Sequence, residues 1–201
     1  GGIIKTQEKL NNCSTAASII TTAQAGETDF HYLRPIWKEN TEKDSLIGVG
    51  ITGIATGTIL DLDLKSSAEL VRDTNIKIAK QIGINPSSRC TTIKPSGTTS
   101  LVLGTSSGIH AWHSEYYIRR VRLNKTEGIY SYLKEKIPQL LEDLIEDPKN
   151  GAVACLPQKA PENSIYRTED TFDFLERVKK VKNEWINSGH VSGQNTNNVS
   201  A

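Results

Sequence analysis

The spacing of apolar positions along the chain predicts helices that alternate with short strands. Residues 6–25 carry apolar or small side chains at helical intervals and stop before Gly26, which predicts a helix that ends there. The same spacing predicts a short helical turn within 28–40. It predicts further helices over 67–82 after a cap at Ser66 or Ser67, over 127–146 with a break at Pro138, and from a cap at Thr168 to Gly189. A short apolar run predicts a buried strand at 46–55 that leads into a loop, and further short strands are predicted at 89–94 and 153–156. Alternating apolar and basic residues predict another strand at 116–123. This alternation indicates the α/β class, with a sheet or a barrel at its centre.

The longer predicted helices each have an apolar stripe, which we expect to be buried. In the first helix the stripe consists of Leu10, Cys13, Ala16, Ala17, Ile20 and Ala23. In the helix over 67–82 it consists of Leu70, Ile76, Ile78, Ala79 and Ile82, and in the last helix of Phe172, Leu175, Val178, Val181, Trp185 and Ile186. No internal repeat or low-complexity linker interrupts the pattern, so we expect residues 1–201 to form a single segment of one fold.

Composition narrows the classes of function. The 201 residues are 36% hydrophobic and 23% charged, which is typical of a globular chain. A net charge of +1 argues against a basic surface that binds nucleic acid. No apolar run is long enough to span a membrane. Cys13, Cys90 and Cys155 are widely spaced and form no CxxC pair, which favours a reducing compartment over a disulfide framework. We therefore expect a cytoplasmic protein that binds neither nucleic acid nor a membrane.

The most informative candidate chemistry lies in the run KPSGTTSLVLGTSSGIH at 94–110. Gly97 would let the backbone approach a ligand closely, and the threonines and serines around it stand at a predicted helix start. Free N–H groups and the helix dipole at such a start attract phosphate, although the GK[ST] ending of a Walker loop is missing. The candidate phosphate-binding residues are Ser96, Gly97, Thr98, Thr99 and Ser100. Taken alone, the pattern is more typical of an ordinary turn that caps a helix.

The same run, followed by YYIRRVR at 116–122, resembles the phosphate-binding segment of adenosylcobalamin-dependent ribonucleotide reductases. The match is long and ungapped. Three further stretches agree with it: TDFHYLRPIWKENTEKD at 28–44, LIGVGITGIATG at 46–57 and GHVSGQNTNNVSA at 189–201. The resemblance spans nearly the whole chain, and YYIRRVR is similar to the monomeric branch that uses ribonucleoside triphosphates.

The resemblance implies part of a ten-stranded α/β barrel of the ribonucleotide reductase type. It also implies an oxidoreductase that makes deoxyribonucleotides for DNA replication by radical chemistry. Adenosylcobalamin is the implied cofactor, a ribonucleoside triphosphate the implied substrate, and a thiol system the implied reductant. Residues 96–100 would bind the substrate phosphates, and His110 would lie near the substrate. This segment would position the substrate, while the cofactor supplies the radical chemistry.

The chain departs from the family at the radical cysteine, which the family carries in an Asn-x-Cys-x-Glu motif. Asn11 and Cys13 have the right spacing, but Thr15 replaces the glutamate, and Cys13 lies within a predicted helix as a core residue. The C-terminal cysteine pair that re-reduces such enzymes is absent too. We therefore assign no catalytic residue and no metal ligand. We expect a barrel segment that is incomplete at both ends, with the radical motif upstream of Gly1 in the missing part of the barrel.

Two other functions stay open on the sequence. One is a non-catalytic nucleotide- or phosphate-binding fragment, such as a split-gene subunit that needs a partner. The other is a diiron-dependent reductase of the same superfamily, which the glycine at 97 disfavours.

Several polar residues have an ordinary structural interpretation beside the functional one. Arg119, Arg120 and Arg122 either neutralise a triphosphate or are surface residues, and we favour the surface for at least two of them. The acidic run over 142–147 is predicted to be the solvated face of a helix. The remaining expectations are Cys90 and Cys155 as core residues of strands, and His113 as a surface residue.

Overall fold

The computed structural model describes residues 3–192 and 199, which form two compact units. Unit 1 consists of residues 1–112 together with 161–201, and unit 2 consists of residues 113–160. No composition shift or linker in the sequence marks either boundary. Of the stretch GHVSGQNTNNVSA, residues 193–198, 200 and 201 lie outside the described residues.

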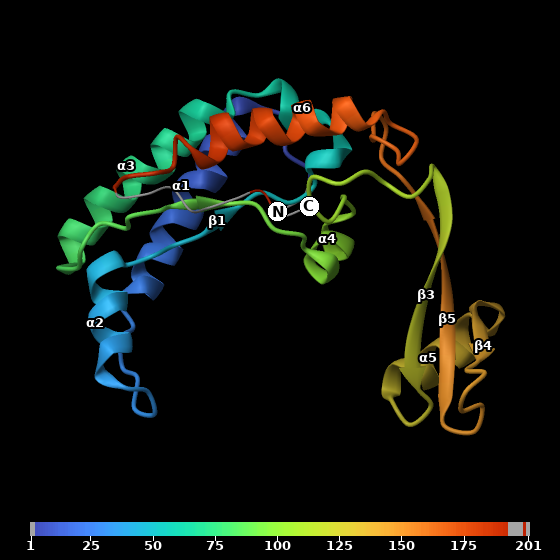
Figure 1. Ribbon diagram of the computed structural model, residues 1–201. Coiled ribbons are helices and arrows are strands. Elements are labelled where there is room, and N and C mark those ends of the chain that lie inside the picture. Colours follow the sequence, from blue (N-terminus) through green and yellow to red (C-terminus); the bar gives the residue numbers. More distant parts are fainter. Residues whose placement is uncertain (1–2, 193–198, 200–201) are drawn as a thin grey trace. The chain divides into compact units, whose positions relative to one another are not determined.

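Unit 1 contains most of the helices (Figure 1). They are α1 (Gln7–Ala25), α2 (Pro35–Asp44), α3 (Leu64–Ile82), α4 (Gly97–Leu103) and α6 (Thr171–Val181), which continues into a π turn over Lys182–Ile186. Two 3-10 turns, Ile54–Thr56 and Thr58–Asp61, connect β1 to α3. No described helix is long and apolar enough to cross a membrane.

Aspartates cap α3 and α6, where the sequence predicted serine or threonine. The Asp63 carboxylate accepts a hydrogen bond from the N–H of Ser66 (2.9 Å), and Asp170 caps α6 in the same way. The predicted serine caps for the helix over 67–82 and the predicted cap at Thr168 are therefore wrong. Asp, Ser and Thr all cap helices well, so residue type alone does not choose between neighbours.

A short parallel pair of strands lies at the centre of unit 1. β1 (Val49–Gly50) pairs in parallel with β2 (Thr91–Thr92), and Val199 adds an isolated parallel bridge to Ile93. Both strands are shorter than the apolar runs that predicted them. The run after β1 turns because Gly53 adopts φ +78° and leads into a 3-10 turn.

The face that α1 buries is mostly polar, which contradicts the predicted apolar stripe. It consists of Leu10, Ser14, Ser18 and Thr22. Ile20 of the predicted stripe is 68% exposed. Ser18 donates a hydrogen bond to the Val71 carbonyl of α3 (2.8 Å), and the Asn75 amide donates to Thr22 (2.9 Å). Small hydroxyl side chains let the two helices approach closely, and these hydrogen bonds offset the cost of burying polar groups.

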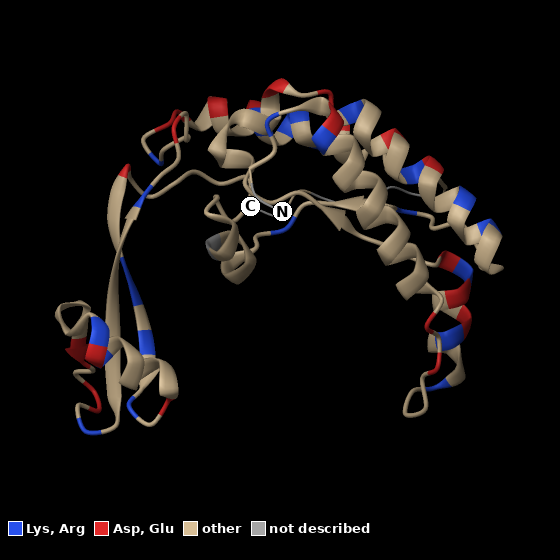
Figure 2. Ribbon diagram, turned by 180° about the vertical axis from the view of Figure 1, so that it is seen from behind, with Lys and Arg blue, Asp and Glu red and all other residues tan. Residues whose placement is uncertain are grey.

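The buried face of α3 also differs from the predicted apolar stripe and includes polar residues. It consists of Leu64, Ser67, Ala68, Val71, Asn75 and Ala79. Ile76 and Ile82, which the pattern placed inside, are exposed. Acidic and basic residues are both spread along this helix (Figure 2).

The apolar core of unit 1 surrounds Trp185, which is 1% exposed. Its other large members include Leu10, Ile47, Val49, Ile51, Ile54, Ile59, Leu64, Val71, Ile93, Ile109, Val181 and Ile186. The predicted stripe of the last helix is correct at its C-terminal end, since Val181 is buried with these residues. It is wrong at Phe172 and Leu175, which are exposed.

Unit 2 is an antiparallel sheet with one helix (Figure 1). Its elements are β3 (Tyr116–Asn124), α5 (Gly128–Lys136), a 3-10 turn (Pro138–Leu140), β4 (Leu141–Asp143) and β5 (Gly151–Lys159). The strand order is β3-β5-β4, with Tyr116 opposite Lys159 and Asn124 opposite Gly151. The predicted helix over 127–146 is correct only as far as Lys136. Pro138 ends it, and the residues beyond pair with β5 as a strand.

The arginines of β3 pair with the acidic run that follows. Arg120 forms an ion pair with Glu142 (2.5 Å), and Arg122 forms one with Glu146 (3.3 Å). All four side chains are more than half exposed, so these pairs contribute little stability. The surface interpretation favoured for two of the arginines is confirmed. The acidic run is solvated as predicted, but it is not helical.

Candidate functional site

The turn predicted to bind phosphate follows β2 and opens α4. Gly97, Thr98 and Thr99 are exposed, and Ser96 is half-buried. Ser100 is 3% exposed and donates its hydroxyl to the Gly97 carbonyl (3.2 Å). Three of the five predicted residues are therefore exposed to a ligand, whereas the Ser100 hydroxyl bonds within α4 itself.

The first turn of α4 offers free backbone donors. The Ser96 N–H donates to the Ser107 carbonyl (2.5 Å), and the Ser100 N–H donates to the Ser96 carbonyl (3.2 Å). The N–H groups of residues 97–99 have no acceptor in the described part of the chain. Such groups attract anions, as does the positive end of a helix dipole. Because α4 has only seven residues, the N–H groups would carry most of that attraction.

Gly97 stands in open space. A Cβ built on it meets no atom within 4 Å, and its φ lies outside the left-handed region. Protein packing therefore does not require glycine here. The space around it is available to a ligand, in agreement with the close approach that the sequence predicted at this glycine.

Three threonines fix the loop that follows α4. Thr52 donates its hydroxyl to the Ser107 carbonyl (3.1 Å), and the Thr56 and Thr105 hydroxyls lie 2.8 Å apart. Gly53 permits this approach, since a Cβ there would lie 2.2 Å from the Thr105 hydroxyl. The loop is thus held against the turn that follows β1.

His110 lies at the end of this loop and is half-buried. Its Nε2 is 2.6 Å from the Ser107 hydroxyl, while its buried Nδ1 has no partner in the described part of the chain. The Ala55 N–H donates to the Gly108 carbonyl (3.1 Å), which holds the preceding residues. His110 therefore belongs to the same loop system as the phosphate turn. His113 is exposed, as predicted, and belongs to unit 2.

The three cysteines show no sign of a reactive site. Cys90 is fully buried, and burial raises the pKa of its thiol to about 12. Cys13 lies inside α1, as predicted, and is half-buried. Burial, followed by the Glu142 carboxylate, raises the pKa of the half-buried Cys155 thiol in β5. A raised pKa keeps a thiol protonated, and the thiolate is the nucleophilic form. Among the described residues, no group of three or more His, Cys, Asp or Glu side chains could hold a metal ion.

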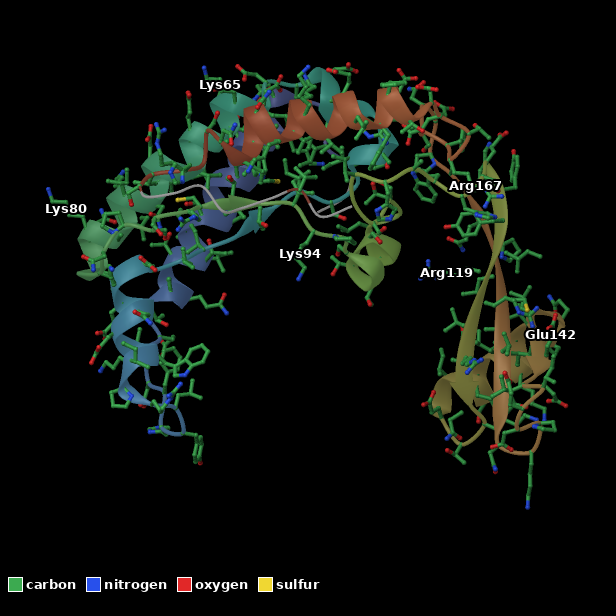
Figure 3. The ribbon with its side chains drawn as sticks, in the orientation of Figure 1. Lys65, Lys80, Lys94, Arg119, Glu142 and Arg167 are labelled. Atoms are coloured by element: carbon green, nitrogen blue, oxygen red, sulfur yellow. The ribbon has the colours of Figure 1, made fainter. Side chains whose placement is uncertain are left out.

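Lys94 is a candidate that the list of predicted site residues missed. It is exposed, lies between β2 and Ser96, and forms no ion pair among the described residues. Figure 3 shows its side chain extending away from the helices α1 and α3. A lysine two residues before the predicted phosphate-binding turn is the sequence signal that could have identified it.

Comparison with solved structures identifies the fold. A crystal structure of a B12-dependent, class II ribonucleotide reductase matches 92% of this chain and 30% of its own chain, with a TM-score of 0.75 and 20% identity. Over most of its length the chain therefore has the fold of a class II ribonucleotide reductase. The α/β class is confirmed, while the ten-stranded barrel stays a prediction for the residues described here.

Sequence comparison gives the same result. The adenosylcobalamin-dependent ribonucleoside-triphosphate reductase of Euglena gracilis is 30% identical over 143 residues, which is 67% of this chain and 19% of that protein. The reductases of the same name from Lactobacillus acidophilus and Lactobacillus helveticus are 39% and 35% identical over 57 residues, 28% of this chain. No family model matches the chain. The resemblance seen in the sequence is confirmed: the chain is homologous to these reductases and spans about a fifth of the length of the first.

Proposed function

We propose that this chain is part of an adenosylcobalamin-dependent ribonucleoside-triphosphate reductase, in which residues 96–100 bind the phosphates of the substrate. The observation that supports this most directly is the first turn of α4, whose exposed N–H groups have no acceptor among the described residues. Backbone donors of this kind suit a phosphate, which accepts several hydrogen bonds at once. The homology to triphosphate reductases supplies the class of substrate.

Within this function the chain positions the substrate. The N–H groups of residues 97–99 would donate hydrogen bonds to phosphate oxygens. Lys94, two residues before Ser96, would add positive charge near them. Three threonines keep the loop after α4 in one conformation, so the turn loses little freedom when it binds. His110, in the same loop, would lie near the substrate.

Adenosylcobalamin is the cofactor we propose for the assembled reductase, because the relatives are named for it. When bound, it supplies the radical chemistry. The pocket between α1, β1 and Trp185 does not fit it. That pocket measures about 280 Å³ and is mainly apolar, whereas drug-sized ligands, which are smaller than a corrin, fill roughly 300–1,000 Å³. We assign no residue of the chain to the cofactor.

The proposal extends to the partners of the segment. Residues 1–201 would form one part of the catalytic barrel, with the remaining barrel and a thiol reductant completing the enzyme in the cytoplasm. The short parallel pair β1-β2 and the bridge to Val199 are the elements that further parallel strands would extend.

Substitutions in the turn test the phosphate assignment in the complete reductase. Gly97→Val places a branched side chain in the open space beside the free N–H groups, so it should weaken ribonucleoside-triphosphate affinity on the order of a hundredfold, the loss of about two charge-assisted hydrogen bonds. Ser96→Ala removes one hydroxyl and should weaken affinity less. Gly128→Val is the matched control, because Gly128 also opens a short helix and also faces open space.

Equilibrium binding of a ribonucleoside triphosphate is the measurement, with circular dichroism to show that each variant folds. Unchanged affinity in a folded Gly97→Val protein would show that the turn only caps α4. Triphosphate binding without any reductase activity, in a protein assembled with adenosylcobalamin and a dithiol, would instead favour a non-catalytic nucleotide-binding role.

A further inference from the structure

Arg177 of α6 contacts the loop that follows the phosphate turn. Its side chain is nearly fully buried, and its Nε–H donates to the Ile109 carbonyl (3.0 Å). Ile109 itself is fully buried and directly precedes His110. A buried guanidinium therefore fixes the backbone of the loop at the residue before the candidate site histidine.

The Nη1 and Nη2 groups of Arg177 hold its guanidinium in place. Nη1 and Nη2 donate to the two carboxylate oxygens of Glu169 at 2.6 and 2.7 Å, and the Glu169 side chain is only 15% exposed. A bidentate pair holds the planar guanidinium in one orientation, which a lysine at this position does not reproduce. The Phe174 ring lies 5.3 Å from the guanidinium and covers it.

The residues that precede Ile109 are held by two backbone hydrogen bonds, one of which reaches the 96–100 turn. The carbonyl of Gly108 accepts from the Ala55 N–H (3.1 Å), and the carbonyl of Ser107 accepts from the Ser96 N–H (2.5 Å). Ser96 directly precedes α4. The loop over 107–109 thus connects the guanidinium to the start of the turn through consecutive residues.

We propose that Arg177, oriented by Glu169, is a positioning residue that holds the loop over 107–110 and thereby keeps the 96–100 turn in the conformation that binds a triphosphate. This inference rests on the proposed function of the turn. Arg177 does not touch the phosphates. It acts through the carbonyl of Ile109, so its loss lowers binding without removing any group that contacts the ligand.

The decisive variant removes the pair without leaving a buried charge. Removing one partner alone strands the other charge and destabilises the fold, whereas replacing both by uncharged side chains of similar volume leaves no unpaired charge. Arg177→Met with Glu169→Gln therefore keeps the protein folded and leaves the Ile109 carbonyl without its donor. Lys180→Met with Glu184→Gln is the matched control, since that pair (3.1 Å) joins α6 to the π turn and is partly exposed.

Three measurements are compared in the protein: tripolyphosphate affinity, backbone hydrogen exchange and melting temperature. The Arg177/Glu169 double variant should bind tripolyphosphate about tenfold more weakly, which corresponds to one charged hydrogen bond. Its amides at Ala55 and over 105–112 should exchange faster, with the melting temperature unchanged. The control should match the wild type in all three. Arg177→Lys, which keeps the charge but not the planar bidentate geometry, should show intermediate affinity.

The outcomes separate this inference from the proposed function. If the wild type binds tripolyphosphate and Gly97→Val abolishes binding, unchanged affinity in the Arg177/Glu169 double variant overturns the inference alone. Unchanged exchange at the loop overturns it as well. If the wild type binds no tripolyphosphate, the phosphate site and the positioning role are both wrong.

Discussion

At the scale of single residues, the two glycines beside the candidate site have opposite reasons for being glycine. Gly53 has φ +78°, and an added Cβ would lie 2.2 Å from the Thr105 hydroxyl, whereas an added Cβ at Gly97 meets nothing. Gly53→Ala should therefore cost about 3 kcal/mol from strain and overlap, lowering the melting temperature by roughly 10 °C. Gly97→Ala should leave the melting temperature nearly unchanged. Thermal unfolding followed by circular dichroism measures both.

A second substitution separates the two causes at Gly53. Thr105→Ala removes the overlapping hydroxyl, so Gly53→Ala combined with Thr105→Ala should lose less stability than the sum of the single changes. If the two losses simply add, the close approach to Thr105 is not what requires glycine.

Cys90 gives a prediction about pH. Burial raises the pKa of its thiol from 9.0 to about 12, so folding favours the protonated form. This stabilisation is fully present below pH 9 and is lost as the pH rises from 9 towards 12. The free energy of unfolding should therefore fall over that range by more in the wild type than in Cys90→Ala. Denaturant titrations of both proteins between pH 8 and about 11 measure the difference. Parallel curves would rule out the contribution from Cys90.

The residues of the site were only partly predictable from the sequence. The exposed turn at 97–99 follows from a local pattern of glycine and threonine after a strand. The role of Ser100 inside α4 depends on which way one hydroxyl points, and the contact from Arg177 crosses 68 residues of sequence. Sequence patterns report local spacing, whereas the contact between Arg177 and Ile109 depends on tertiary packing.

At the scale of elements, the interface between α1 and α3 depends on one buried amide. Asn75 is fully buried. Its amide donates to the hydroxyls of Thr22 and Ser87, and its carbonyl oxygen accepts from the Ser87 N–H, each at 2.9 Å. Asn75→Ala leaves these groups without partners and should cost about 2–4 kcal/mol. Asn85→Ala is the control, because that exposed amide makes a single bond to the Glu42 carbonyl. Equilibrium denaturation of the two variants should differ accordingly, and equal stabilities would contradict a structural role for the buried network.

The same interface explains why helix positions were predicted better than helix faces. Periodicity located α1 and α3 closely, because helix propensity and glycine stops are local signals. Hydrophobic periodicity gave the wrong buried face, because it predicts that apolar Ile20 is buried and polar Ser18 is exposed. In the structure Ser18 is buried and bonded to the Val71 carbonyl, while Ile20 is exposed. The strand β4 was missed for a related reason, since its residues pair with β5 residues 9 to 13 positions further along the chain.

At the scale of the whole molecule, large apolar side chains remain on the surface around α2. Within residues 31–37 they are Tyr32, Leu33, Ile36 and Trp37, of which Tyr32 is 98% exposed. α2 buries none of its residues. Exposed aromatic and aliphatic groups gathered in this way favour association. The isolated chain should therefore self-associate as its concentration rises, and Ile36→Lys with Trp37→Glu should reduce this. Sedimentation velocity over a range of concentrations measures it, and a monomer at every concentration would contradict the expectation.

The last prediction concerns the activity of the isolated chain. The homologous reductases are several times longer, and reduction in that family requires a radical cysteine and a reducing pair, as the resemblance implies. Cys13 lies within α1, Cys90 is buried with a raised pKa, and Cys155 belongs to the other compact unit. None of the three has the setting of a radical or redox cysteine. The purified 201-residue chain, given each ribonucleoside triphosphate with adenosylcobalamin and a dithiol, should therefore form no deoxynucleotide. The same preparation should still bind tripolyphosphate if the turn at 96–100 is a phosphate site. Deoxynucleotide formation that disappears in Cys13→Ser would show that the helical cysteine does carry the chemistry.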